Sequence, residues 1–84
     1  MAETQLVPVT VPRWGLTMED GVVQEWMVGE GEEVREREVL VTIETDKAVG
    51  EVEAPVAGRV ARILVPEGTA VRPGELLAEI ETTA

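Results

Sequence analysis

Three short segments of the chain alternate apolar and polar residues with a period of two. Apolar side chains occupy every second position from Val7 to Val11, from Val39 to Ile43 and from Leu76 to Ile80. Residues two apart share one face of an extended strand, so this pattern predicts half-buried strands. Glycine and proline turn formers separate the segments at short intervals, and no segment keeps an apolar stripe of helical spacing and length. The pattern therefore predicts an all-β fold.

The second half of the chain repeats the first with a shift of 37 residues. Residues 21–45 and 58–82 are identical at 12 of 25 aligned positions, which include turn glycines and core aliphatic residues. An internal repeat of this kind fixes the architecture before any propensity argument does. Two homologous strand sets predict a flattened β-sandwich or barrel of two small antiparallel sheets, related by a quasi-two-fold axis.

Length and composition are typical of one small globular domain. The chain has 84 residues, of which 44% are hydrophobic and 29% charged, so we expect residues 1–84 to form a single domain. The N-terminus has neither the basic start nor the apolar run of a signal peptide, and no segment is long and apolar enough to span a membrane. We expect a cytoplasmic protein, monomeric as an isolated domain.

Charge and missing residue types narrow the function. Acidic residues outnumber basic ones 17 to 7, and the net charge of −10 disfavours nucleic acid and membranes as partners. Proteins with basic patches are favoured instead. The chain contains no His, Cys, Ser, Tyr or Asn, so the usual nucleophile and base pairs and Cys/His metal sites cannot form. We expect a domain that is not itself catalytic and holds no metal.

The candidate for chemistry is Lys47, because the other six basic residues are arginines. It follows the alternating segment that ends at Thr45 and precedes a second one, 48–53. This order predicts a hairpin with Asp46 and Lys47 as its two-residue loop, and the absence of glycine leaves the turn type open. In the second half, the chain ends at the equivalent point. The quasi-two-fold therefore places the hairpin and the termini at opposite ends of the domain.

The sequence around Lys47 resembles the lipoyl domains of 2-oxo acid dehydrogenase complexes. The resemblance is carried by the run ETDKAVGEVEAP (44–55), with GVVQEWMVGEGEEV before it and AGRVARILVPEGTAV after it. The resemblance covers essentially the whole chain. It implies that Lys47 is the lipoylated lysine, N6-lipoyllysine, with Asp46 and Ala48 as its usual neighbours. The implied cofactor is lipoate, bound covalently.

The resemblance also implies a carrier function and a set of partners. A lipoylating enzyme attaches the arm, which then accepts an acyl group from a thiamine-dependent decarboxylase or dehydrogenase. The acyltransferase core passes the acyl group to coenzyme A, and dihydrolipoamide dehydrogenase reoxidises the arm. The domain would belong to, or serve, a dihydrolipoyllysine acyltransferase. A free-standing carrier and the first domain of a longer acyltransferase both remain open.

A loop between the first two predicted strands is the implied recognition element. Its residues Trp14, Leu16, Thr17, Met18 and Glu19 fall on the exposed loop that helps partner enzymes recognise lipoyl domains, and Glu44 is a further candidate. Packing of the apolar loop residues against the hairpin is the alternative. The loop sequence resembles carriers of pyruvate or acetoin dehydrogenase systems more than those of the 2-oxoglutarate enzyme.

Two other positions carry expectations. Arg37 stands where many lipoyl domains have glycine, as does Gly74 in the second half of this chain, which leaves the turn geometry there open. Trp26 alternates with strand residues and aligns with Ile63, so we expect it to pack against the core.

Two rival functions remain for comparison. Biotinyl domains share this architecture, but methionines typically flank their modified lysine, whereas Asp46 and Ala48 do so here. An unmodified interaction module of the same fold, as found in adaptors of export pumps, needs no lysine at the tip.

Overall fold

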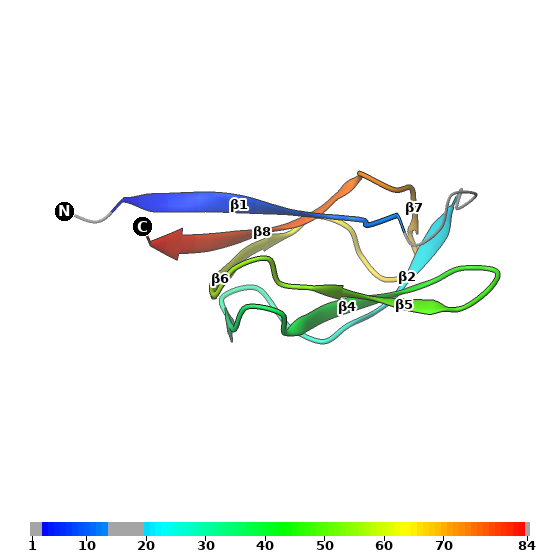
Figure 1. Cartoon of the computed structure of the whole chain (residues 1–84), viewed down its shortest axis with the longest axis horizontal. Helices are drawn as coiled ribbons and strands as arrows, with labels where there is room; N and C mark the ends of the chain where they lie inside the picture. Colours follow the sequence, from blue (N-terminus) through cyan, green and yellow to red (C-terminus); the bar gives the residue numbers. More distant parts are fainter. Residues whose placement is uncertain (1–2, 14–19, 84) are drawn as a thin grey trace.

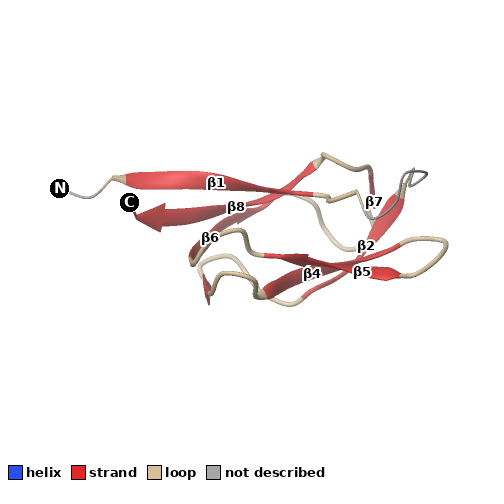
Figure 2. Ribbon diagram, viewed as in Figure 1, coloured by secondary structure: helices blue, strands red, loops and turns tan. Residues whose placement is uncertain are grey.

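The computed structural model describes residues 3–13 and 20–83, and every regular element in these ranges is a β-strand. The strands are β1 (Thr4–Thr10), β2 (Gly21–Trp26), β3 (Glu33–Val34), β4 (Val39–Glu44), β5 (Val49–Glu53), β6 (Gly58–Ile63), β7 (Ala70–Val71) and β8 (Leu76–Thr83). They form two antiparallel sheets with the orders β1-β8-β6-β3 and β5-β4-β2-β7 (Figures 1 and 2). The predicted all-β fold of two antiparallel sheets is confirmed.

The repeat in the sequence is also a repeat in strand pairing. Val23 of β2 pairs with Ile43 of β4, and their equivalents Val60 and Ile80 pair in the same way in β6 and β8. The two shortest strands are exchanged between the halves. β3 follows β2 in the chain but pairs with β6, whereas β7 follows β6 but pairs with β2. Each half therefore completes the sheet of the other. The exchange is the same in both directions, in agreement with the predicted quasi-two-fold axis.

Turn side chains add a second exchange between the halves. The Trp26 amide donates a hydrogen bond to Glu67 Oε2 at 2.9 Å, and the equivalent Ile63 amide donates to Glu30 Oε2 at 2.8 Å. Trp26 is half-buried against the core, and its indole Nε1 donates to the Val65 carbonyl oxygen at 2.8 Å. The expectation that Trp26 packs against the core is confirmed.

The period-two alternation is interrupted once in β4 and once in β8. The β4–β5 pairing skips Leu40 and the β1–β8 pairing skips the equivalent Leu77, so each strand holds one extra residue. Such a β-bulge turns the following side chains to the other face. As a result Leu40 and Leu77 are buried next to the buried Val41 and Ala78, while Leu76 is exposed. The strict alternation predicted for these segments is therefore wrong at the bulges.

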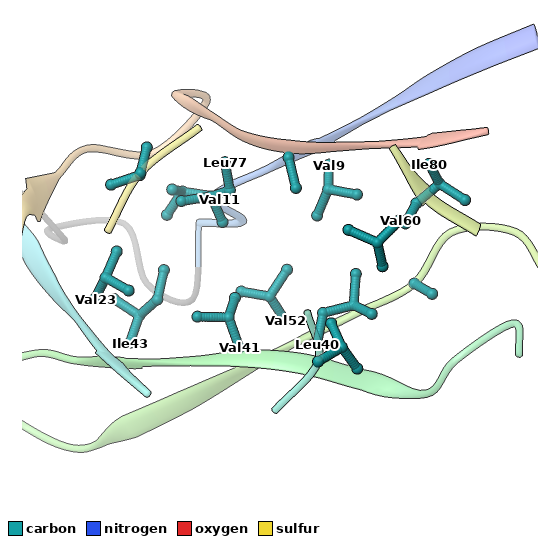
Figure 3. Packing of buried hydrophobic residues seen from close by; sticks show 14 of the residues in the cluster. Val9, Val11, Val23, Leu40, Val41, Ile43, Val52, Val60, Leu77 and Ile80 are labelled. Atoms are coloured by element: carbon teal, nitrogen blue, oxygen red, sulfur yellow. The ribbon is translucent and has the colours of Figure 1, made fainter. Parts of the chain in front are cut away.

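A single core lies between the two sheets. Figure 3 shows Val9, Leu77 and Ile80 of one sheet pointing toward Leu40 and Val41 of the other. Full burial of an aliphatic side chain stabilises the folded state by roughly 1.5–3 kcal/mol, so this layer is the main source of stability.

The two ends of the domain differ. Both termini lie at one end of its 46 Å long axis, and the β4–β5 hairpin lies at the other (Figure 1). Among the residues described, no helix is long and apolar enough to cross a membrane.

Candidate functional site

Lys47 lies at the tip of the hairpin between β4 and β5. The Thr45 amide donates a hydrogen bond to the Ala48 carbonyl oxygen at 2.8 Å, which leaves Asp46 and Lys47 as the two residues of the loop. The hairpin predicted from the sequence is thus present. Because the loop is short and both of its arms are hydrogen-bonded strands, the root of the lysine side chain has a defined position.

The Thr45 hydroxyl organises this loop, a role that the sequence analysis missed. Its Oγ1 donates to the Ala48 carbonyl oxygen at 2.8 Å, and it accepts from the amides of Ala48 at 3.2 Å and Lys47 at 3.4 Å. A hydroxyl that bonds the backbone of the residues just after it is a known turn signal. That signal was available in the order Thr-Asp-Lys.

The backbone angles decide the question of turn type. Arg37 is the one non-glycine residue in the described ranges with a positive φ, so Asp46 and Lys47 both have negative φ. The type I′ turn requires positive φ at both central residues and the type II′ turn at the first, so neither is present. The Thr45 hydroxyl supplies the hydrogen bonds that hold the loop without glycine.

The tip is open to solvent. Lys47, its neighbours Asp46 and Ala48, and Glu44 are all exposed. Within residues 3–13 and 20–83, no hydrogen bond or ion pair involves the Lys47 ammonium group. A lysine amine must be reachable from solvent to be acylated by an enzyme, and this one fits that requirement.

An open groove of about 720 Å³ lies beside the hairpin. Thr45 and Asp46 form its wall on the hairpin side, and Val22 and Ala70 lie on the neighbouring strands that line it. Carboxylates of Asp20, Glu44 and Asp46 make its lining acidic. The groove connects the tip with the outer face of the sheet β5-β4-β2-β7.

Most of the predicted recognition loop lies outside the described residues. Trp14, Leu16, Thr17, Met18 and Glu19 belong to this part, so their predicted role stays a prediction. Glu44 is described, and it lies at the hairpin and lines the groove.

The residue that follows the loop is held by an exposed ion pair. Asp20 Oδ1 lies 3.3 Å from Arg72 Nε, next to β7. Exposed pairs of this kind contribute roughly 0–1 kcal/mol, so the contact adds little to stability.

The turn at Arg37 keeps the geometry of its glycine equivalent. Arg37 has φ 72° and Gly74 has φ 87°. Their amides make matching hydrogen bonds of 2.8 Å, to the carbonyl oxygens of Ala54 and Val11 respectively. The geometry that the sequence left open is therefore a left-handed turn, adopted by a residue type for which it costs roughly 1–2 kcal/mol.

Comparison with known proteins agrees with this geometry. Residues 7–80 match the Biotin_lipoyl family model, which is described as "Biotin-requiring enzyme". A solution structure of the lipoyl domain of the 2-oxoglutarate dehydrogenase complex from Azotobacter vinelandii superposes with a TM-score of 0.67 at 38% identity, covering 86% of this chain and 94% of that domain. The chain therefore belongs to the biotin/lipoyl attachment family, and its fold is that of a lipoyl domain.

Curated relatives carry more specific names. The chain is 48% identical over 63 residues to the dihydrolipoyllysine-residue acetyltransferase component of the pyruvate dehydrogenase complex of Rhizobium meliloti (strain 1021), covering 75% of this chain and 14% of the relative. It is 40% identical over 63 residues to the equivalent component of the acetoin cleaving system of Cupriavidus necator, covering 75% and 17%. The chain thus spans less than a fifth of the length of these two relatives.

Proposed function

We propose that this chain is a lipoyl carrier domain in which Lys47 bears lipoic acid through an amide bond. The observation that carries the proposal is the position of Lys47, the sole lysine of the chain. It is exposed on a two-residue loop at the end of the domain opposite the termini. A modified group there can swing freely, while the rest of a longer protein can be joined at the other end.

Lys47 and its neighbours have different roles in holding the lipoyl arm. Lys47 Nζ supplies the amide nitrogen, and the hydrogen bonds of Thr45 hold the backbone from which the arm extends. Bound lipoate supplies the thiol chemistry that a chain without cysteine lacks, because its strained cyclic disulfide opens readily to a nucleophile. Lys47 is exposed, as are Asp46 and Ala48 beside it, which suits a lysine that an enzyme must reach.

The partners follow from this role. We propose that a thiamine-dependent dehydrogenase loads the arm, that an acyltransferase core unloads it to coenzyme A, and that dihydrolipoamide dehydrogenase reoxidises it. The domain contributes tethering, which raises the effective concentration of the acyl group, and recognition by each enzyme. The two curated relatives are named for a pyruvate and an acetoin complex. The similar solved lipoyl domain comes from a 2-oxoglutarate complex. The comparisons therefore support a complex for a 2-oxo acid or acetoin. The strands from Thr4 to Thr83 enclose one core, which supports a single carrier domain over residues 1–84.

Biotin is the competing modification, because the family includes both carriers. Lipoate is favoured by the neighbours of Lys47, since Asp46 and Ala48 replace the methionines typical of biotinyl domains. The similarity to a solved lipoyl domain supports the same choice.

Intact mass tests the proposal directly. The chain is treated with a lipoate–protein ligase, ATP and lipoate, and in parallel with a biotin ligase, ATP and biotin. We expect a mass increase of one lipoyl amide, and none in the Lys47→Arg variant, which keeps the charge of the tip. Because the side chain is exposed, thermal unfolding of the variant should match that of the wild type. A biotin-sized increase, or no increase with lipoate, would overturn the proposal.

A further inference from the structure

The outer face of the sheet β5-β4-β2-β7 carries an apolar row directly behind the hairpin. Val22 pairs with Ala70 on one side and with Glu44 on the other, and Glu44 pairs with Val49. Residues paired across antiparallel strands point to the same face. All four are exposed, so this outward row reads Ala70, Val22, Glu44 and Val49, with one carboxylate between apolar side chains.

The quasi-two-fold supplies an internal control for this row. In the other sheet the equivalent row reads Glu33, Arg59, Glu81 and Leu6. There Arg59 lies between two glutamates, and opposite charges paired across strands stabilise a sheet by roughly 0.2–1 kcal/mol. The fold is the same in both places, so the apolar row near the hairpin is not a requirement of the fold.

The two sheets also differ in charge, and the sheet that carries the hairpin is the more acidic one. The four strands β2, β4, β5 and β7 contain four acidic residues and no basic one, a formal charge of −4. The strands β1, β3, β6 and β8 contain three acidic and two basic residues, a formal charge of −1. One of these bases, Arg62, lies 3.5 Å from Glu79. The four glutamates of β2, β4 and β5 have no basic residue within their own four strands, and Arg72, which follows β7, pairs with Asp20 at the groove.

We propose that this row, Ala70–Val22–Glu44–Val49, together with the adjoining groove is the docking surface for the thiamine-dependent dehydrogenase. The dehydrogenase would present an apolar contact flanked by basic side chains. The inference rests on the proposed function. The groove joins the row to the tip, because Val22 and Ala70 line it together with Thr45 and Asp46. An enzyme that receives the arm of Lys47 and covers this groove contacts the row as well.

The charge of Lys47 favours the dehydrogenase over the lipoylating enzyme as the occupant. The lipoylating enzyme meets a free amine, whose positive charge offsets the carboxylates of Glu44 and Asp46. Conversion of the amine to an amide removes that charge. The dehydrogenase therefore meets a tip with carboxylates alone, to which a basic surface is complementary.

Matched arginine variants test the docking surface. Val49→Arg and Val22→Arg place a base within the row, and Arg59 shows that the equivalent position of Val22 accepts arginine. Leu6→Arg is the control, because Leu6 is the two-fold equivalent of Val49 and their exposures are 50% and 49%. None of these changes adds a lysine that could be modified.

Each variant is lipoylated, its modification is measured by intact mass, and reductive acylation is then followed. The thiamine-dependent dehydrogenases for pyruvate, acetoin and 2-oxoglutarate are tried with the wild type, and the one with the lowest KM serves as probe. We expect equal lipoylation of all chains. For Val49→Arg and Val22→Arg we expect KM to rise about tenfold at unchanged kcat, as for a central interface residue, and for Leu6→Arg to stay within about twofold.

A variant that changes only a charge tests the surface without disturbing the packing of the sheet. Glu44→Gln keeps the shape of the row, and we expect it to weaken the dependence of KM on ionic strength. Unchanged KM in both valine variants, or an equal rise in Leu6→Arg, would overturn the docking surface. So would a loss of self-association in the valine variants, which would make the row a contact between copies of this chain. If the wild-type chain is not lipoylated, the proposed function is wrong. The intact mass detects this outcome before any KM is measured, so it is distinguished from a failure of the docking surface.

Discussion

The two halves of this domain share a backbone but differ at their outer ends. Their pairings agree residue for residue, down to the extra residues Gln24 and Ala61 in the equivalent strands β2 and β6. They diverge beyond Glu44 and its equivalent Glu81. Beyond these residues β4 ends and the chain turns through the exposed hairpin into β5, whereas β8 continues and its pairing with β1 extends through Thr82 and Thr83. The comparison teaches that the symmetric positions maintain the fold, whereas the asymmetric ones are free to serve function.

The largest contrast between equivalent positions is expected at two glycines that begin β2 and β6. A Cβ on Gly58 would collide with the backbone carbonyl oxygen of Glu81, which cannot move without breaking the sheet. A Cβ on Gly21 would lie 2.6 Å from Ile43 Cγ2, which belongs to a side chain, and 3.3 Å from the Glu44 carbonyl oxygen. We expect Gly58→Ala to cost about 3 kcal/mol of unfolding free energy and Gly21→Ala about 1–2 kcal/mol.

Urea unfolding of the two variants measures both values. Equal losses would show that the contact with a backbone atom is no harder to relieve than the contact with a side chain, and the two-fold would then be closer than the structure shows.

A smaller effect is expected at Thr45, where the halves differ in function. Thr45→Val keeps the shape but removes the hydroxyl that bonds the backbone at three points. We expect a loss of about 1 kcal/mol in stability and an approximately fivefold slower lipoylation, because the loop no longer holds Lys47 in place.

Two controls separate positioning from stability. Thr45→Ser should restore the rate of lipoylation, since it keeps the hydroxyl. Thr82→Val changes the two-fold equivalent, which lies in the paired strand β8, and should leave the rate unchanged. The positioning role would be wrong if the rate followed stability alone across these three variants.

The smallest effect is expected where the two turns differ only in residue type. Arg37 has φ 72°, a left-handed conformation that suits glycine. We expect Arg37→Gly to raise the unfolding free energy by about 0.5–1 kcal/mol, because the relief of strain outweighs the greater entropy of glycine in the unfolded chain. Gly74→Arg should lower it by a similar amount. Chemical denaturation decides, and a less stable Arg37→Gly variant would contradict the expectation.

Much of the architecture could be predicted from the sequence because it is written in repeats and in local turn residues. The repeat with a shift of 37 residues predicted two related sheets, and the segment around Asp46 and Lys47 predicted the hairpin. The strands β3 and β7 could not be predicted, since two residues each are too few for any periodicity. Their pairing depends on contacts between the halves.

The β-bulges and the hydrogen bonds of the turns could not be predicted from the sequence for a related reason. Leu40 and Leu77 are extra residues only with respect to a partner strand, so no pattern along one strand reveals them. The bonds from Trp26 to Glu67 and from Ile63 to Glu30 join residues more than 30 positions apart. At the site, the identity of the lysine was visible, but the outward apolar row emerged only from the pairing of four strands.

The exchange of β3 and β7 makes each half of the domain incomplete on its own. Neither half can satisfy the edge of its own sheet, because the strand that does so comes from the other half. A half-length chain with this topology would reach the same pairing only by associating with a second chain. The covalent connection between the halves replaces that association with an intramolecular one, which does not depend on protein concentration.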